Sequence, residues 1–277
     1  MAKLQSQPSP IRSLQVLLPS LFTVARIVCG FFAVVFAFKG MYWLDASGNL
    51  ALSVMAFDNA AKTIGWAILF DSLDGRVARL VGSDSTFGRE FDSLADVVTF
   101  GMAAPVLLFF WGVMPIHAAV RTLSSEALYV AGWIVACTFL VCGAFRLARF
   151  NLGDEEPDGE HRNSDGLPIP GAAGAIAAVV HFAKSPLNRF DYGVAWLGLA
   201  AVLSLLMTSR IRYDLWAMLP PGLQKPVCSV LLGCLLVWGV WTYSEQVLLV
   251  LALGFVTSGL LAHFILRLRP RTRLAQS

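Results

Sequence analysis

The sequence has few charged residues for its length. Asp, Glu, Lys and Arg make up 14% of the 277 residues, hydrophobic residues make up 57%, and the mean hydropathy is +0.67. A soluble domain typically has about 25% charged and about 45–50% apolar residues. The scarcity of charge therefore argues against a soluble domain. Because apolar runs are spread along the whole chain, we expect a single membrane domain over residues 1–277.

Cysteine and histidine patterns that would indicate disulfides or zinc are also missing. All five cysteines fall in apolar runs and none forms a CxxC pair, so no disulfide framework is expected. The four histidines lack the spacing of zinc ligands, and we assign them no role. The net charge is only +3, and we expect no nucleic-acid partner.

Eight apolar runs approach the length of about 20 residues that a membrane-spanning helix needs. The fifth, PGAAGAIAAVVHFA, is short and rich in Gly and Ala. It is either packed closely against its neighbours through small residues or not a full span. The sequence predicts an all-α polytopic integral membrane protein with about eight transmembrane helices, and those after about residue 190 receive no role. The runs cover residues 16–38, 51–73, 90–113, 127–149, 170–184, 192–209, 226–243 and 246–267.

The distribution of Lys and Arg predicts the orientation of the chain. With the N-terminus in the cytoplasm, fifteen Lys and Arg residues fall in cytoplasmic segments and five on the opposite side, and Arg26 lies within the first span. This bias follows the positive-inside rule. We therefore expect both termini, and the loops 74–90 and 150–169, to be cytoplasmic.

Four aspartates stand where the second and third apolar runs meet, in DSLDGRVARLVGSDSTFGREFDSLADVVTF, residues 71–100. Asp71 and Asp74 are three residues apart, and Asp92 and Asp96 are four apart, so each pair lies on one helical face. If the two helices are antiparallel neighbours, the two faces converge at the cytoplasmic edge of the membrane. Carboxylates this close repel one another, and each costs about 2.5–3.5 kcal/mol within a membrane.

Divalent cations would offset that repulsion, because Mg²⁺ and Mn²⁺ prefer oxygen ligands. Two ions shared by the four aspartates suit phosphoryl chemistry, in which paired metals stabilise the attacking and leaving oxygens. Gly75 and Gly88 let a ligand approach closely, and Arg79 has the planar fork that pairs with phosphate. The acids leave a second class of protein open, a cation-coupled transporter.

The complete motif resembles the signature of the CDP-alcohol phosphotransferase family at every fixed position and gap. It reads Asp71-x-x-Asp74-Gly75-x-x-Ala78-Arg79, eight residues, then Gly88-x-x-x-Asp92-x-x-x-Asp96. The resemblance implies an all-helical membrane enzyme, expected as a homodimer, that transfers a substituted phosphate from a CDP-linked donor to an alcohol and releases CMP.

The same resemblance implies roles for the motif residues. The four aspartates would bind the metals, and Asp96 would also act as the general base that takes the proton of the acceptor hydroxyl. The residues implied to border the CDP part of the donor are Asp71, Gly75, Ala78, Arg79 and Gly88.

Three further stretches resemble one group within this family, the membrane-integral phosphatidylserine synthases of bacteria. They are LPSLFTVARIVCGFF (18–32), CGAFRLARFNL (142–152) and DGLPIPGAAG (165–174). The resemblance implies CDP-diacylglycerol and L-serine as substrates, phosphatidylserine and CMP as products, and a bacterial inner membrane with the active site facing the cytoplasm.

The acceptor alcohol has two candidates. A guanidinium binds a carboxylate bidentately, so the residues expected to bind serine are Arg146, Arg149 and Asn151. The segment Thr23-Val24-Ala25-Arg26 instead resembles the opening of phosphatidylglycerolphosphate synthases, whose acceptor is glycerol 3-phosphate. Serine synthases more often carry Asn where this chain has Arg26, so both acceptors stay open.

Overall fold

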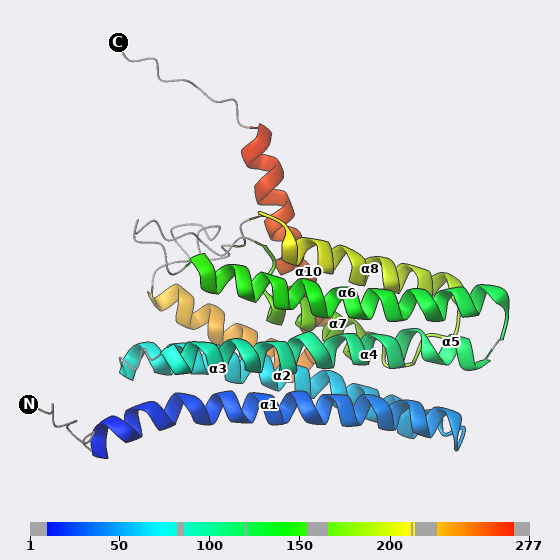
Figure 1. Cartoon of the computed structure of the whole chain (residues 1–277), viewed down its shortest axis with the longest axis horizontal. Helices are drawn as coiled ribbons and strands as arrows, with labels where there is room; N and C mark the ends of the chain where they lie inside the picture. Colours follow the sequence, from blue (N-terminus) through cyan, green and yellow to red (C-terminus); the bar gives the residue numbers. More distant parts are fainter. Residues whose placement is uncertain are drawn as a thin grey trace, which may run out of the picture.

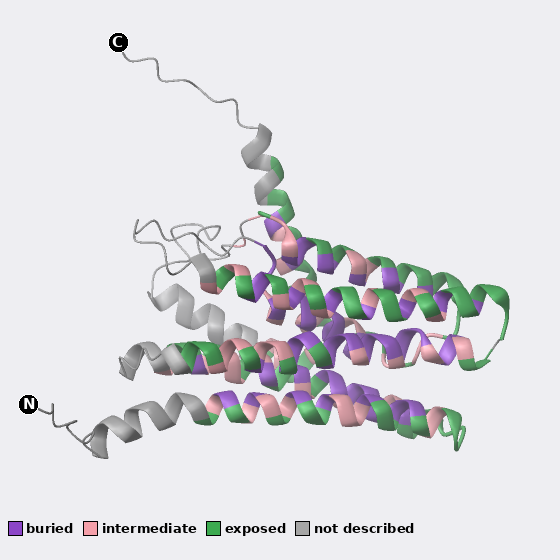
Figure 2. Ribbon diagram, viewed as in Figure 1, coloured by how far each residue is buried: buried purple, intermediate pink, exposed green. Residues whose placement is uncertain are grey.

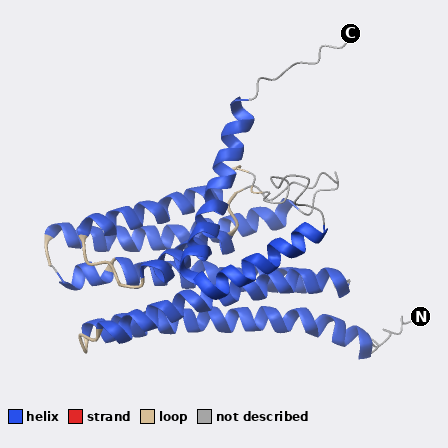
Figure 3. Ribbon diagram, turned by 180° about the vertical axis from the view of Figure 1, so that it is seen from behind, coloured by secondary structure: helices blue, strands red, loops and turns tan. Residues whose placement is uncertain are grey.

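The protein was studied as a computed structural model, which describes residues 10–81, 86–119, 121–153, 166–211, 213 and 226–268. Within these ranges the chain is helical and contains no strand (Figure 3). The elements, labelled as in Figure 1, are α1 (Pro10–Asp45), α2 (Leu50–Val81), α3 (Thr86–Asp96), the π-helix η1 (Val97–Met102), α4 (Ala103–Gly112), α5 (Met114–Ala119), α6 (Leu123–Gly153), α7 (Ile169–Ala183), α8 (Phe190–Thr208) and α10 (Pro226–Leu268).

The predicted apolar runs are helical where the structure describes them, apart from the last residue of three runs, Val113, Lys184 and Ser209. The last two runs correspond to the two helical halves of α10, which are separated by a kink at Tyr243, where the backbone angles are non-helical (φ −134°, ψ 51°). Figure 1 shows the two halves of α10, orange and red, running in different directions. The break falls where the sequence analysis ends one run and begins the next.

Five segments of the described chain are long and apolar enough to cross a membrane, together with the shorter apolar helix α7. This is fewer than the eight predicted spans, partly because α2 carries charged side chains and α7 is short. The protein is an integral membrane protein. The five segments are Leu21–Asp45, Gly88–Ala119, Leu123–Asn151, Phe190–Thr208 and Trp238–Leu261.

Helix α7 lies inside the bundle, where small residues allow close packing. Ala172, Ala173, Ala175 and Ile176 are almost completely buried, and α7 contacts α2, α4, α8 and α10. Buried residues concentrate in the middle of the bundle in Figure 2, and exposed residues line its outside. Many of those exposed residues are large and apolar, as expected of a lipid-facing surface. The Gly- and Ala-rich run is therefore a buried packing helix.

Helix α1 approaches η1 closely, and a glycine makes this possible. A Cβ atom at Gly30 would lie 2.7 Å from the Cα of Thr99, which is too close for any side chain. Arg26 lies one helical turn before Gly30 on α1, and Asp96 lies just before η1. The contact between Gly30 and Thr99 thus fixes α1 beside the acidic motif.

Candidate active site

The two acidic faces meet around the side chain of Arg26. One guanidinium nitrogen, Nη1, pairs with Asp71 and lies 2.9 Å from Oδ1 of Asp96, and the other, Nη2, lies 2.6 Å from Oδ1 of Asp92. Nη2 also donates to the backbone carbonyl of Asp92 at 3.1 Å. Three carboxylates, one from α2 and two from α3, therefore share one positive charge supplied by α1.

The fourth aspartate is also held by α1. The hydroxyl of Thr23 donates a hydrogen bond to Oδ2 of Asp74, and both residues are buried. Thr23 and Arg26 are three residues apart, so they share one face of α1. Two residues of the first helix thus contact all four aspartates of the motif.

This contact of α1 with the aspartates was not predicted from the sequence. A signal was nevertheless present, because Arg26 is the single Lys or Arg in the apolar run 16–38. A charged residue inside a membrane span requires a partner, although the sequence alone does not identify which residue supplies it. The resemblance of residues 23–26 to phosphatidylglycerolphosphate synthases instead suggested a link between Arg26 and the acceptor alcohol.

The donor set of the four aspartates fits a hard divalent cation. Every side-chain oxygen that these four residues offer belongs to a carboxylate, the kind of ligand that Mg²⁺ and Mn²⁺ prefer. Oδ1 of Asp96 is buried and has no aligned hydrogen bond in the described structure, although it lies 2.9 Å from Nη1 of Arg26. As they stand, the described side chains do not form a preassembled group of three metal ligands, and Arg26 lies between the carboxylates.

The three residues expected to bind serine lie in different environments. Arg146 on α6 is buried, its Nε has no hydrogen-bond partner among the described residues, and its charge interacts with that of Asp96. Asn151 donates through Nδ2 to the hydroxyl of Ser93 at 3.2 Å, next to Asp92 on α3. Of the three, Arg146 is the one that is buried and has an unpartnered nitrogen among the described residues.

Arg149 makes contacts at the end of α8. Its two terminal nitrogens donate to the carbonyls of Thr208 and Ser209, each at 3.3 Å. These carbonyls belong to the C-terminal end of a helix, where backbone oxygens lack helical partners. In this arrangement Arg149 caps α8 and joins it to α6.

The residues expected to border CDP lie on the same two helices as the aspartates. Gly75 is exposed on α2, and a Cβ atom added there would meet no described atom within 4 Å. Packing within the described chain therefore gives no reason for a glycine at this position. Gly88 is exposed at the start of α3. Ala78 and Arg79 belong to α2, but their side chains lie outside the described part of the structure.

A second polar cluster lies on the other half of α2. Nδ1 of His181 lies 2.5 Å from Oδ1 of Asp58, and Nε2 of His181 lies 3.0 Å from the hydroxyl of Ser244. Lys184 lies 2.8 Å from Glu245 and 3.5 Å from Asp58. The cluster joins α2, α7 and α10 immediately after the break at Tyr243. Sequence analysis assigned none of these residues a role, because they are far apart in the chain.

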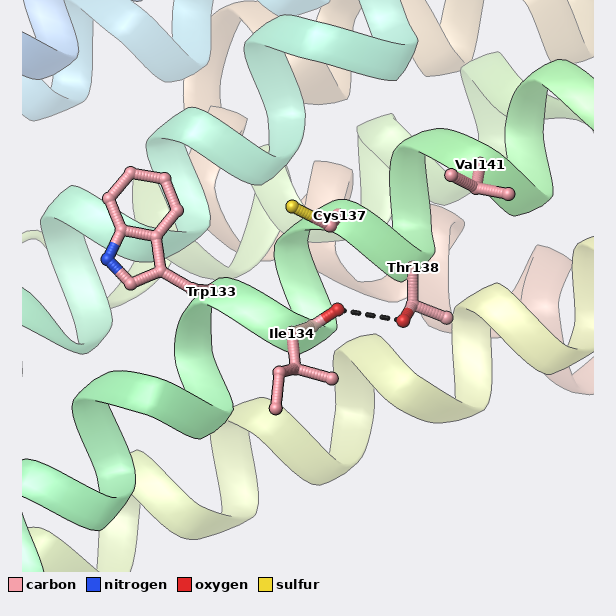
Figure 4. A pocket seen from close by; sticks show the side chains of 5 residues that line it. All are labelled: Trp133, Ile134, Cys137, Thr138 and Val141. Carbon is pink, nitrogen blue, oxygen red and sulfur yellow. Dashed lines mark hydrogen bonds between the residues drawn. The ribbon is translucent and has the colours of Figure 1, made fainter.

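A shallow groove of about 450 Å³ lies along one face of α6. Its lining contains no charged side chain, and Figure 4 shows the hydroxyl of Thr138 bonded to the carbonyl of Ile134, at 2.7 Å. Its composition suits contact with lipid or another apolar helix and offers no catalytic group for phosphoryl transfer. The lining residues are Trp133, Ile134, Cys137, Thr138 and Val141.

Comparison with known proteins identifies the class to which this site belongs. A family model described as CDP-alcohol phosphatidyltransferase matches residues 16–208, a range that contains the four aspartates, Arg26 and Arg146. The chain belongs to this family and is a transferase. The family is generally dependent on divalent metals, which agrees with the all-oxygen donor set.

Relatives within the family share a serine-linked name. A CDP-diacylglycerol–serine O-phosphatidyltransferase of Helicobacter pylori is 33% identical over 203 residues, which cover 71% of each chain. A protein of the same name from Mycobacterium leprae is 31% identical, covering 69% of this chain and 54% of the relative. An archaetidylserine synthase of Methanothermobacter thermautotrophicus is 31% identical, covering 71% and 69%. These comparisons favour neither the glycerol 3-phosphate enzyme nor the transporter.

Proposed function

We propose that the protein transfers a phosphatidyl group from CDP-diacylglycerol to L-serine, giving phosphatidylserine and CMP. The carrying observation is the convergence of Asp71, Asp92 and Asp96 on one point, with Asp74 beside them on α2. The serine-linked names of the relatives support the acceptor. Arg26 belongs to the segment that resembles glycerol 3-phosphate enzymes. Because its guanidinium pairs with the aspartates, we do not assign it to binding of the acceptor.

The four aspartates would hold the divalent metal, Mg²⁺ or Mn²⁺, and we propose two ions. Bound there, metal ions neutralise phosphate charge and stabilise the leaving CMP. The residues proposed to border the CDP moiety on α2 and α3 are Asp71, Gly75, Ala78, Arg79 and Gly88. No described atom lies within 4 Å of a Cβ atom added at Gly75, which supports close approach of a ligand at that point.

Asp96 is proposed to take the proton from the serine hydroxyl. The serine oxygen attacks the phosphorus that carries the diacylglycerol, and the bond from that phosphorus to the CMP oxygen breaks. A carboxylate at this place acts mainly through its position, since a proton acceptor must lie within hydrogen-bond reach of the proton that it takes. Oδ1 of Asp96 is buried and accepts no hydrogen bond from the described residues, which supports this assignment.

Arg146, Arg149 and Asn151 are proposed to bind the serine acceptor. Arg146 is the strongest candidate for the serine carboxylate, because it is buried and its Nε lacks a partner in the described structure. Asn151 is connected to α3 through Ser93. Arg149 would have to exchange its bonds to Thr208 and Ser209 for a bond to serine.

We further propose eight spans, both termini in the cytoplasm, and a site that faces the cytoplasm from a bacterial inner membrane. The surplus of Lys and Arg on the predicted cytoplasmic side supports this orientation. Helix α2 counts as a span because its charges Asp58 and Lys62 pair with each other at 2.7 Å. Labelling of introduced cysteines in the loop 150–169 from each side of the membrane tests the orientation.

A homodimer is proposed from the family resemblance. Light scattering on the protein eluting from a gel-filtration column in detergent gives the mass of the complex directly, once the detergent is subtracted. A protein mass of about twice 30.0 kDa supports the dimer, and a mass equal to one chain contradicts it.

Release of CMP by purified protein tests the proposed reaction. The protein is incubated with CDP-diacylglycerol and Mn²⁺ or Mg²⁺, and with serine, glycerol 3-phosphate or inositol in parallel. Release with serine alone, lost on adding EDTA and restored by excess metal, is expected. Release only with glycerol 3-phosphate would keep the metal chemistry and overturn the acceptor.

A further inference from the structure

Arg26 is the most enclosed charged side chain among those described. Its exposed fraction is 0%, and its guanidinium faces one carboxylate of α2 and two of α3. A buried charge without partners is strongly unfavourable, so Arg26 and the acids require each other. One positive charge nevertheless faces three carboxylates, which leaves the cluster able to attract more cations.

Arg26 and a divalent cation make conflicting demands on these carboxylates. The contacts of 2.6 Å to Asp92 and 2.9 Å to Asp96 are direct, with no space for an ion between nitrogen and oxygen. An ion bound by the other carboxylate oxygens would still lie a few ångströms from a buried positive charge, and like charges repel strongly where water is excluded. Binding of the ion and of the guanidinium is therefore coupled unfavourably.

Within the described structure, the guanidinium is held through its two terminal nitrogens. Nε of Arg26 has no hydrogen-bond partner among the described residues, so its bonds run through the two terminal nitrogens that face the aspartates and the carbonyl of Asp92. Helix α1 itself stays in place through the close contact of Gly30 with Thr99 and the bond from Thr23 to Asp74. The contacts that hold α1 in place are thus separate from those of the Arg26 guanidinium.

We infer that Arg26 is a tethered cation of the aspartate cluster, which competes with the divalent metal for Asp71, Asp92 and Asp96. The inference rests on the proposed metal site. Arg26 holds the carboxylates together when divalent metal is scarce and lowers the affinity of the site for it. Replacement of Arg26 therefore strengthens metal binding while it weakens the fold in the absence of metal, a combination that a metal ligand or a purely structural residue does not produce.

The test measures binding of Mn²⁺ to the purified full-length protein by electron paramagnetic resonance of the free ion, without substrates. Arg26→Asn is expected to tighten binding by about tenfold or more, the scale on which one nearby charge shifts the proton affinity of a carboxylate. Arg26→Lys keeps the charge but loses the planar fork, so its affinity for Mn²⁺ is expected to lie between those of the wild type and Arg26→Asn. Arg189→Gln removes an exposed arginine that pairs with Asp191 at 3.4 Å, and as a control it should change nothing.

Thermal unfolding of the same proteins supplies a second readout. In EDTA, Arg26→Asn should melt below the wild type, and Mn²⁺ should raise its melting temperature more than that of the wild type. Unchanged or weaker Mn²⁺ binding in both Arg26 variants would overturn the competition. If wild type and variants all fail to bind Mn²⁺, the proposed metal site falls and the inference falls with it. If Arg26→Asn does not fold, Arg26→Lys alone decides between tighter and unchanged binding.

Discussion

His181 on α7 and Asp58 on α2 form a buried pair, with Nδ1 of the histidine 2.5 Å from Oδ1 of the aspartate. The other ring nitrogen of His181 reaches Ser244, which lies on α10 and outside the matched family region that ends at residue 208. The pair therefore contributes to the attachment of the C-terminal helix to the catalytic bundle. It lies away from the acidic motif, since the 13 residues from Asp58 to Asp71 span about 20 Å of helix.

Removal of this pair should destabilise the protein without altering its chemistry. His181→Leu removes the hydrogen bond to the buried carboxylate of Asp58, which keeps its lysine partners, and a hydrogen bond to a charged group contributes about 1.5–3 kcal/mol. We expect a clear fall in melting temperature in detergent, with the KM for serine unchanged in the protein that remains folded. His117→Gln, at a histidine that pairs with the exposed Glu126, serves as the control and should melt close to the wild type.

Asp96→Asn should abolish turnover and leave the protein folded. The amide is nearly the same size as the carboxylate, but it cannot accept the proton of the serine hydroxyl. CMP release is the measurement, and the melting temperature shows that the protein is intact. Asp191→Asn changes an exposed aspartate and should retain full activity. Near-normal turnover by Asp96→Asn would rule out the general-base role.

Gly75→Ala should reduce activity without loss of stability. An added methyl group meets no described atom within 4 Å, and alanine favours a helix over glycine by about 1 kcal/mol. A fall in CMP release together with an equal or higher melting temperature would place a ligand against this position. Gly65→Ala makes the same change at another open site on α2 and should keep its activity. Equal activity in both variants would show that Gly75 faces no ligand.

Arg146 and Arg149 should respond differently to substitution. Hydrogen bonds to charged groups contribute about 1.5–3 kcal/mol, so Arg146→Met should raise the KM for serine by about ten- to hundredfold and leave the KM for CDP-diacylglycerol near its normal value. Arg149→Met should mainly lower the melting temperature, because it removes the bonds to Thr208 and Ser209 at the end of α8. The opposite pattern would indicate that Arg149, and not Arg146, binds the serine carboxylate.

The motif and the helices were predictable because they depend on short-range patterns. Spacings of three and four residues placed the aspartates in two pairs, and runs of apolar residues located every described long helix. The helices continue past these runs at the motif, since α2 reaches Val81 and α3 begins at Thr86. A search for apolar runs misses such extensions because these terminal turns are polar.

The contacts made by α1 could not be predicted in the same way. Arg26 lies 45 residues before Asp71 and 66 before Asp92, and no local pattern specifies which helices become neighbours. The pair of His181 with Asp58 is separated by 123 residues. In both cases the chemistry of a buried charge indicates that a partner exists, and only the packing of the helices identifies it.

The π-helix η1 lies between two parts of one apolar segment, the acidic face of α3 and the buried face of α4. An α-helix turns by about 100° per residue, and a π-turn contains one more residue than an α-turn. Pro105, which has no N–H to bond the carbonyl of Gly101, lies in the first turn of α4. One residue deleted from the regular turns of α3 or α4 would rotate Asp92 and Asp96 by about 100° relative to the core, whereas η1 accommodates a single extra residue and keeps the acidic face of α3 in line with the buried face of α4.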